Sequence, residues 1–181
     1  MNYDVIIIGA GPGGIFAAYE LMQHKPDLKV AVFEAGHALD KRRCPIDGEK
    51  IKTCIGCKSC SIMSGFGGAG AFSDGKYNIT NDFGGTLYEY IGKKQALDLM
   101  HYVDEINMRY GGDGCKLYTT AGTRFKTLCI QNDLHLLDAS VRHLGTDINY
   151  IVLENLYAYL ENKVDFFFDT PVEAVKIIVG G

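Results

Sequence analysis

Four cysteines in this chain have the residue type and spacing to bind a metal. Cys44, Cys54, Cys57 and Cys60 form a C-x9-C-x2-C-x2-C run. Four thiolates within seventeen residues can satisfy a tetrahedral zinc ion or a four-iron cluster. The close triplet favours iron–sulfur ligation, whereas zinc sites more often use two separated C-x2-C pairs. We therefore treat the four cysteines as candidate metal ligands.

Two other interpretations of these cysteines stay open. Cys54 and Cys57, or Cys57 and Cys60, could form a redox-active C-x-x-C pair that exchanges electrons with a cofactor. Lys52 and Lys58 would favour the thiolate form in that case. The third interpretation is reduced, unreactive thiols packed under a loop. The remaining cysteines, Cys115 and Cys129, are isolated and are expected in the core.

A glycine motif near the N-terminus has the spacing of a dinucleotide site. Gly9, Gly11 and Gly14 form G-x-G-x-x-G between an apolar run at 3–9, typical of a strand buried on both faces, and a helical pattern at 13–25. In this context Gly9 allows a tight turn, Gly11 lets a pyrophosphate approach the backbone, and Gly14 lets helix and strand pack closely. The start of the helix would offer unpaired N–H groups to the phosphates.

Glu34 completes the dinucleotide pattern. It lies at the end of a second apolar run, 29–36, twenty residues after Gly14. A carboxylate at this place can accept hydrogen bonds from ribose hydroxyls, and it argues against the 2′-phosphate of NADP. The sequence predicts a Rossmann-like β-α-β unit with a dinucleotide bound at Gly9–Gly14.

Longer segments resemble known flavoproteins. "GAGPGGIFAAYEL" (9–21), with Pro12 and Gly13, resembles the FAD-binding start of glutathione-reductase-like proteins. "GFGGAGAFSDGKYNITNDFGG" (65–85) and "RHLGTD" (142–147) resemble segments of the bacterial FAD-dependent dehydrogenase family, a largely uncharacterised group. The resemblance covers essentially the whole chain. It implies a flavin enzyme of the glutathione-reductase type.

The resemblance also implies where the flavin ring contacts the chain. The glycine loop at 65–76 would lie along the isoalloxazine, since glycines allow close backbone approach to a flat ring. The alternative is that these glycines only serve tight turns. The candidate flavin-contacting residues are Gly67, Gly68, Ala69, Gly70, Ser73, Asp74 and Lys76.

Arg142 and His143 are candidate catalytic residues. They follow an apolar pattern at 133–141 that predicts a strand, and sites gather at strand ends in α/β folds. His143 could act as a general acid or base near neutral pH, and Arg142 could orient a carboxylate substrate. The alternative is a structural role for both.

The remaining pattern predicts an α/β fold with an inserted glycine- and cysteine-rich segment and part of a second domain. Further helices are predicted at 93–111 and 147–163, the latter with Asp147 as N-cap, and further strands at 164–170 and 172–181. The predicted divisions are 1–92 for the FAD-binding domain with its cysteine- and glycine-rich loop, 93–146 for an inserted substrate domain, and 147–181 for a return to the first domain. Later flavin-site motifs (A-T-G and G-D) are not found, so we expect an N-terminal fragment.

Composition excludes some classes of partner. The 181 residues are 47% hydrophobic with a net charge of −4, so no basic excess favours nucleic acid or anionic membranes. No apolar run approaches the ~18 residues of a membrane span, and the N-terminus lacks the pattern of a signal peptide. We therefore expect a cytoplasmic protein with reduced thiols. The oligomeric state stays open.

Together these features predict an FAD-dependent oxidoreductase. It would transfer a hydride or electron pair between a nicotinamide cofactor, NAD(P)H, and an unknown small-molecule substrate, with an iron–sulfur cluster or zinc as a further cofactor. One alternative is a non-catalytic dinucleotide-binding module with a structural metal site. Another is an inactive fragment that folds without retaining FAD.

Overall fold

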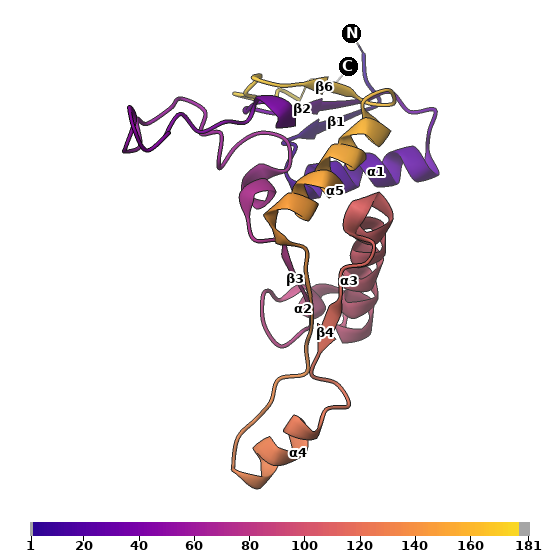
Figure 1. Cartoon of the computed structure of the whole chain (residues 1–181). Coiled ribbons are helices and arrows are strands. Elements are labelled where there is room, and N and C mark those ends of the chain that lie inside the picture. The colour runs from indigo at the N-terminus through magenta and orange to yellow at the C-terminus, as the bar shows by residue number, and fades with distance from the viewer. Residues whose placement is uncertain (1, 178–181) are drawn as a thin grey trace. The chain divides into compact units, whose positions relative to one another are not determined.

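The chain folds into two compact units. The structure, a computed structural model, describes residues 2–177 (Figure 1). Unit 1 contains the residues up to Phe72 and those from Leu153 onward, and unit 2 is Ser73–Val152. The divisions therefore fall at 72 and 152, not at the predicted 92 and 146. The difference arises because residues 76–79 form a strand paired within unit 2, and such long-range pairing leaves no local signal in the sequence.

Unit 1 is built on a three-stranded parallel sheet. Strands β1 (Val5–Ile8), β2 (Val30–Phe33) and β6 (Asp165–Phe167) lie in the order β1-β2-β6. Helix α1 (Pro12–His24) connects β1 to β2. The predicted β-α-β unit is confirmed, as is the later strand that extends the sheet. The carboxyl ends of the three strands consequently meet at one edge.

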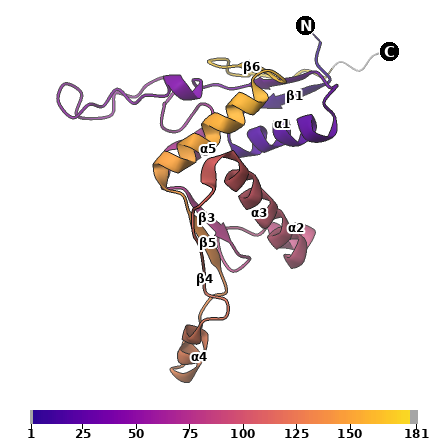
Figure 2. The ribbon, with the colours of Figure 1, turned by 45° about the vertical axis from the view of Figure 1, so that its right-hand side comes forward.

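Aromatic side chains form the core on one face of this sheet. Figures 1 and 2 show α1 on that face, together with the end of α5 (Gly145–Leu160) that belongs to unit 1. Phe66 is fully buried and packs edge-on against Tyr157 and Phe166, at ring distances of 5.1 and 5.8 Å. Burying an aromatic ring of this kind stabilises the unit by roughly 1.5–3 kcal/mol.

The opposite face of the sheet is open within the described residues. Ile6 and Ile8 of β1 are each 57% exposed, so the prediction that this strand is buried on both faces is wrong. A cavity of about 370 Å³ lies against these residues and Phe33. Residues 172–177 border it without forming a strand, and the end of the predicted strand at 178–181 lies outside the described residues.

Unit 2 combines an antiparallel sheet with helices. Its sheet has the order β3-β5-β4, and helix α3 contacts β3. The elements are β3 (Lys76–Ile79), α2 (Leu87–Ile91), α3 (Lys93–Asn107), β4 (Leu117–Thr119), α4 (Arg124–Gln131) and β5 (Ser140–His143). The helix predicted at 93–111 is confirmed over most of its length, whereas β3, β4, α2 and α4 were not predicted.

Two sequence predictions need correction in unit 2. The strand predicted at 133–141 begins only at Ser140 and continues to His143, because the apolar residues before it form no ladder. The helix predicted at 147–163 begins at Gly145, so Asp147 lies in its first turn and is not the N-cap.

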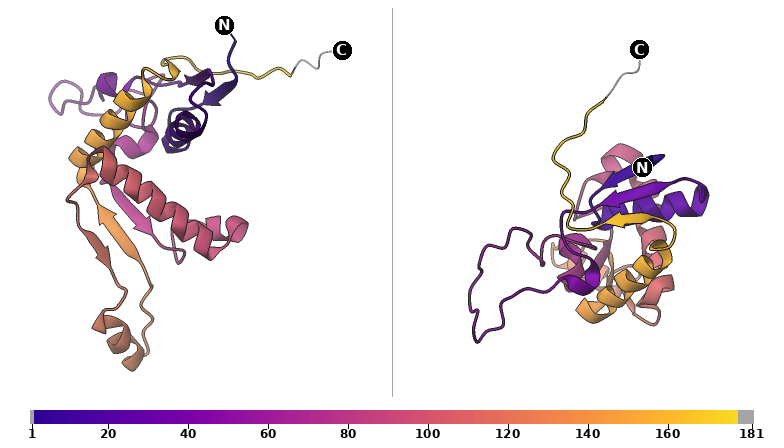
Figure 3. Two further views of the ribbon diagram at one scale, coloured as in Figure 1. Left: turned by 90° about the vertical axis from the view of Figure 1, so that its right-hand side faces the viewer. Right: turned by 90° about the horizontal axis from the view of Figure 1, so that it is seen from above.

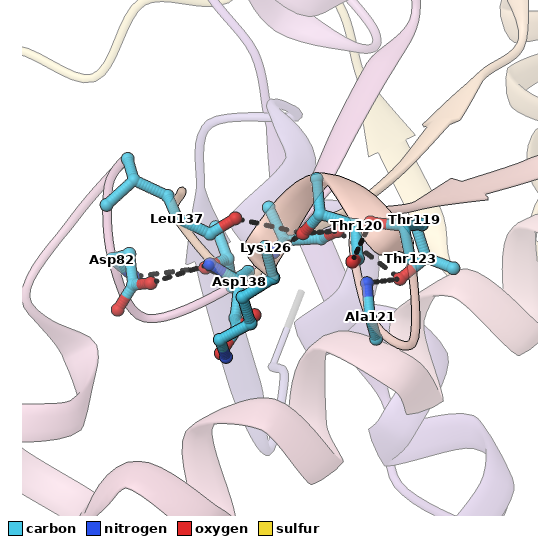
Figure 4. A network of polar contacts seen from close by, with 10 residues as sticks. Asp82, Thr119, Thr120, Ala121, Thr123, Lys126, Leu137 and Asp138 are labelled. Atoms are coloured by element: carbon cyan, nitrogen blue, oxygen red, sulfur yellow. Dashed lines mark hydrogen bonds and ion pairs between the residues drawn. The ribbon is translucent and has the colours of Figure 1, made fainter. Parts of the chain in front are cut away.

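Polar contacts hold the segment around α4 to the end of the strands (Figure 4). The hydroxyl of Thr120 donates to the carbonyl of Leu137 at 2.9 Å and accepts from the amide of Ala139 at 3.0 Å. Lys126 pairs with Asp138 at 2.6 Å. These side chains replace ladder hydrogen bonds where β4 and β5 diverge. Among the described residues, no helix combines the length and apolar character that crossing a membrane requires.

Candidate functional site at the carboxyl edge of the parallel sheet

The turn between β1 and α1 needs glycine at two positions. Gly9 has φ +98°, a conformation that L-residues rarely adopt, and its amide donates to the carbonyl of Phe33 at 2.7 Å. A Cβ at Gly14 would lie 1.9 Å from the carbonyl oxygen of Gly9. The tight turn and the close helix–strand contact are therefore as predicted. Nucleotide binding by this turn stays a prediction.

The N-terminus of α1 faces open space. Gly11 is the N-cap, no side chain caps the helix, and Pro12 occupies its first turn. A Cβ at Gly11 or at Gly13 would meet no atom within 4 Å. The first amides of this thirteen-residue helix and its positive dipole end can therefore receive phosphate oxygens.

Glu34 is used differently from the prediction. Its side chain is almost fully buried, with the residue 7% exposed. One carboxylate oxygen accepts from the amide of Ala10 at 2.7 Å, and the other accepts from the amides of Gly36 and Gly65 at 2.8 and 2.9 Å. A carboxylate has about four acceptor positions, and three are taken. Glu34 thus joins three segments of the site, and ribose binding by it stays a prediction.

The start of the glycine loop lies against the dinucleotide turn. The amide of Gly67 donates to the carbonyl of Ala10 at 2.8 Å, and a Cβ at Gly68 would lie 3.3 Å from Cα of Gly11. Ala69 and Gly70 follow in an exposed 3-10 turn, η2 (Gly68–Phe72). Unit 1 therefore brings together the predicted residues of the turn, Glu34 and residues 67–70.

Arg42, which the sequence did not single out, holds this loop in place. It is 4% exposed and donates to four carbonyls, those of Ser61, Ile62, Phe66 and Gly68, at 2.6–2.9 Å. Burial lowers the pKa of its guanidinium, and the nearby Glu34 opposes that shift. No local pattern marks Arg42, because its carbonyl partners lie 19–26 residues away.

The four cysteines share one small cavity. Figure 3 shows the cysteine loop, residues 44–60, projecting from the body of unit 1. A cavity of about 100 Å³ is lined by Cys44, Cys54, Cys57 and Cys60, and all four thiols are free. Within residues 2–177, however, no group of three or more His, Cys, Asp or Glu is arranged as ligands to a metal ion. The four cysteines lie around one cavity, as the sequence suggested, but they are not arranged as ligands around a metal ion.

A larger cavity lies beside the ends of β2 and β6. It measures about 510 Å³, and its walls include Ala35 and His37 after β2 and Asp169 and Pro171 after β6. The cysteine loop contributes Cys57, Lys58 and Ser59. The hydroxyl oxygen of Ser59 is buried and has no hydrogen-bond partner. Such an oxygen calls for a ligand or water, so this cavity has the features of a binding site.

The predicted catalytic arginine is committed to an ion pair in unit 2. The Nε and Nη2 atoms of Arg142 donate to the two carboxylate oxygens of Asp104, each at 2.7 Å, and Nη1 donates to the carbonyl of Cys115. These hydrogen bonds to the Asp104 carboxylate raise the pKa of Arg142. Both side chains are largely buried. This geometry favours a structural role, and substrate binding by Arg142 stays a prediction.

The other predicted residues of unit 2 lie near one end of the β3–β5 pair. His143 is exposed and lies opposite Lys76. Lys76 pairs with Asp74 at 2.7 Å, and this hydrogen bond lowers the pKa of the Asp74 carboxyl. The hydroxyl of Ser73 accepts from the amide of Gly75 at 3.3 Å. Four candidate polar side chains are thus clustered, but their contact with flavin or substrate stays a prediction.

Unit 2 has a cavity that the sequence did not reveal. It measures about 440 Å³ and lies between β3 and α3. Apolar side chains such as Ile79, Leu99 and Val103 line most of it, and Tyr77 and Asp104 contribute polar atoms. The helical spacing of Leu99 and Val103 could have indicated an apolar face, but not that this face borders a cavity.

Comparisons with known proteins find one family match, over the N-terminal part of the chain, and several partial relatives. Residues 1–40 match the Thi4 family. The thiamine thiazole synthase of Yarrowia lipolytica is 60% identical over 35 residues, which are 19% of this chain and 11% of that protein. An uncharacterized protein of Clostridium beijerinckii is 39% identical over 71 residues, 39% of this chain and 13% of that protein. The matched stretches therefore span only about a tenth of these relatives' lengths.

One solved structure is similar over more of the chain. It is the L-amino acid deaminase from Proteus myxofaciens in complex with anthranilate, with a TM-score of 0.40 and 13% sequence identity. The alignment covers 98% of this chain and 40% of the deaminase.

Proposed function

We propose that this protein is an FAD-dependent oxidoreductase whose adenosine-diphosphate site is the carboxyl edge of the unit 1 sheet. The turn between β1 and α1 carries this proposal. It combines a glycine with positive φ, a glycine in close backbone contact, and an uncapped helix N-terminus facing open space. That combination suits a pyrophosphate, which needs close backbone approach and amide donors.

The residues around the turn have separate tasks in this proposal. The amides that open α1 bind the pyrophosphate, and Gly11 leaves room for it. Glu34 holds the turn and the glycine loop next to each other through its three hydrogen bonds from backbone amides. Residues 67–70 begin beside Gly11, where a Cβ at Gly68 would lie 3.3 Å from Cα of Gly11, and they are candidates for flavin contact.

The chemistry would come from the bound cofactor. A flavin supplies two-electron transfer, and the protein orients it and its reaction partners. We propose NAD(P)H as the electron donor and a small molecule in the cytoplasm as the substrate. The match of residues 1–40 to the Thi4 family covers the whole predicted dinucleotide pattern from Gly9 to Glu34. This similarity supports the turn as the functional site, and the choice of FAD is part of the proposal.

Titration of FAD into three proteins tests the binding site. The Gly11→Val variant should lower FAD affinity at least tenfold, about 1.4 kcal/mol, because its side chain fills the space before the helix. The Gly13→Ala variant is the control, since its Cβ also meets open space but adds only one small group. Equal affinity of Gly11→Val and wild type would exclude the turn as the FAD site.

Anaerobic addition of NADH to the FAD-loaded protein tests the reaction. Loss of the visible flavin absorption would support an oxidoreductase. Tight FAD binding without reduction by NADH or NADPH would instead favour the non-catalytic dinucleotide-binding module.

A further inference from the structure

The cysteine loop lacks the contacts that ordinarily hold a loop of this length. Residues 52–59 make no hydrogen bond within the described part of the chain, and Cys44, Cys54, Cys57 and Ile55 are exposed. Ordered loops beyond ~12–15 residues without secondary structure usually serve a function. Something besides the backbone must therefore hold this loop when it is ordered.

Both ends of the loop, in contrast, are fixed. Arg42 precedes it and binds the carbonyls of Ser61 and Ile62 just after it. This clamp brings the two ends of the loop together, and the four cysteines between Arg42 and Ser61 line one cavity. At about 100 Å³, the cavity has room for more than one water, each of which occupies ~30 Å³ in the liquid. The shared cavity argues against a single C-x-x-C pair, which would bring together only two thiols.

We infer that Cys44, Cys54, Cys57 and Cys60 form a thiolate site for a soft metal centre, whose occupation orders the cysteine loop. The shared chemistry is four-sulfur ligation, which suits both Zn²⁺ and an iron–sulfur cluster. The thiols are not set as ligands before binding, so the metal would draw residues 52–59 inward, where no hydrogen bonds oppose the movement. Binding energy at such a site is also local folding energy.

Ordering this loop has a consequence for the neighbouring cavity. Cys57 lines both the cysteine cavity and the 510 Å³ cavity at the ends of β2 and β6, and Lys58 and Ser59 line the latter. If the FAD proposal holds, on which this step rests, the metal centre completes a wall beside the nucleotide. Metal-loaded protein should then bind FAD at least threefold more tightly than metal-free protein.

Metal analysis of anaerobically purified protein tests the inference in two arms. One sample is loaded with Zn²⁺ or Co²⁺ and the other with Fe²⁺ and sulfide. Wild type should retain metal in one arm, with a thiolate-to-cobalt absorption band or a broad visible band that dithionite bleaches. Each of Cys44→Ser, Cys54→Ser, Cys57→Ser and Cys60→Ser should lower retained metal at least tenfold. The Cys115→Ser and Cys129→Ser controls should retain it fully.

Tryptic cleavage gives a readout that does not depend on the variants. Lys50, Lys52 and Lys58 are exposed in the loop, so metal binding should slow cleavage there at least tenfold. Cleavage after Lys126 in unit 2 should be unchanged. Retention of metal in neither arm, or retention by any of the four Ser variants, would overturn the inference. Retained metal without any FAD binding would overturn the proposed function and leave the metal site standing.

Discussion

Two connections at the carboxyl edge of the parallel sheet are held in different ways. The dinucleotide turn, residues 9–14, is fixed by backbone contacts, which include the approach of Gly14 to the carbonyl of Gly9 and a hydrogen bond from the Gly9 amide to Phe33 of β2. The cysteine loop is fixed at its ends, where the Arg42 side chain binds carbonyls of the chain that follows it, and inside it, among the described residues, only a local turn at 47–51 is hydrogen-bonded. The dinucleotide turn needs no further partner to hold its conformation. The cysteine loop carries four free thiols around one cavity, and they are not arranged as ligands.

The contrast shows two ways in which a site can be prepared for its ligand. In the turn, the positive φ of Gly9 and the close contact of Gly14 with Gly9 determine the conformation, so a ligand meets preset amides. In the cysteine loop, residues 52–59 keep conformational entropy that is lost only when a ligand binds. Substitutions in the turn should therefore change global stability, whereas substitutions inside the loop should have mainly local effects. The predictions below test this division.

The largest expected effect is at Gly14. Gly14→Ala should lower the free energy of unfolding of unit 1 by about 3 kcal/mol, because the new Cβ would lie 1.9 Å from the carbonyl oxygen of Gly9. Gly13→Ala is the matched control on the same helix, and it should be neutral or slightly stabilising. Urea unfolding followed by circular dichroism measures both. Similar stabilities of the two variants would show that backbone contact does not fix the turn.

Arg42 should have the next largest effect. Arg42→Met removes a buried cation that binds four carbonyls, so we expect a loss of about 2–3 kcal/mol. Its exposed neighbour provides the control, and Arg43→Met should change stability by less than about 0.5 kcal/mol. Equal stability of the two variants in the same urea experiment would mean that the loop ends are held by something other than Arg42.

A smaller loss of stability is expected when Glu34 is replaced. Glu34→Gln keeps the shape but replaces one acceptor oxygen by a donor that must face a backbone amide, at a cost of about 2 kcal/mol. Glu20→Gln on α1, where the half-buried carboxylate pairs with His24, should cost under about 0.5 kcal/mol. Thermal and urea unfolding in the absence of nucleotide separate this structural role from ribose binding. Unchanged stability of Glu34→Gln would show that the three hydrogen bonds of Glu34 do not stabilise the fold, and ribose binding would be the role left for it.

The smallest effect is expected inside the cysteine loop. The amides of Ile51, Glu49 and Lys50 donate to one oxygen of Asp47 at 2.8–2.9 Å and lower the pKa of its carboxyl below the ordinary 3.8. A lowered pKa stabilises the turn above pH 3.8, and this stabilisation is lost as pH falls through the lowered value.

An NMR titration follows this local turn. In the wild type, the amide signals of residues 49–51 should shift together with a midpoint below pH 3.8. The Asp47→Asn variant should have the same urea unfolding curve as wild type at neutral pH. That variant keeps an acceptor oxygen and should lose the titration. A midpoint at or above pH 3.8 would contradict the hydrogen-bonded turn.

The dinucleotide pattern could be predicted because its signals are local. An apolar run, three glycines at fixed spacing and a helical repeat all lie within 36 residues, and each glycine has a steric reason that holds in any such turn. Unit 2 was less predictable. Its sheet pairs Tyr77 with Arg142, 65 positions apart, and strand pairing over such distances has no sequence signature that one chain reveals.

For the site residues, the sequence determined their types and the tertiary structure decided their roles. The positions of Gly9 and Gly14 follow from backbone sterics alone, so the sequence was sufficient for them. Glu34, Arg142 and Arg42 carry charges that can serve a ligand or the fold, and only their neighbours distinguish the two. In the folded chain Glu34 binds three amides, Arg142 binds Asp104, and Arg42 binds four carbonyls. A buried charge must be compensated by whatever surrounds it, and those surroundings come from distant parts of the chain.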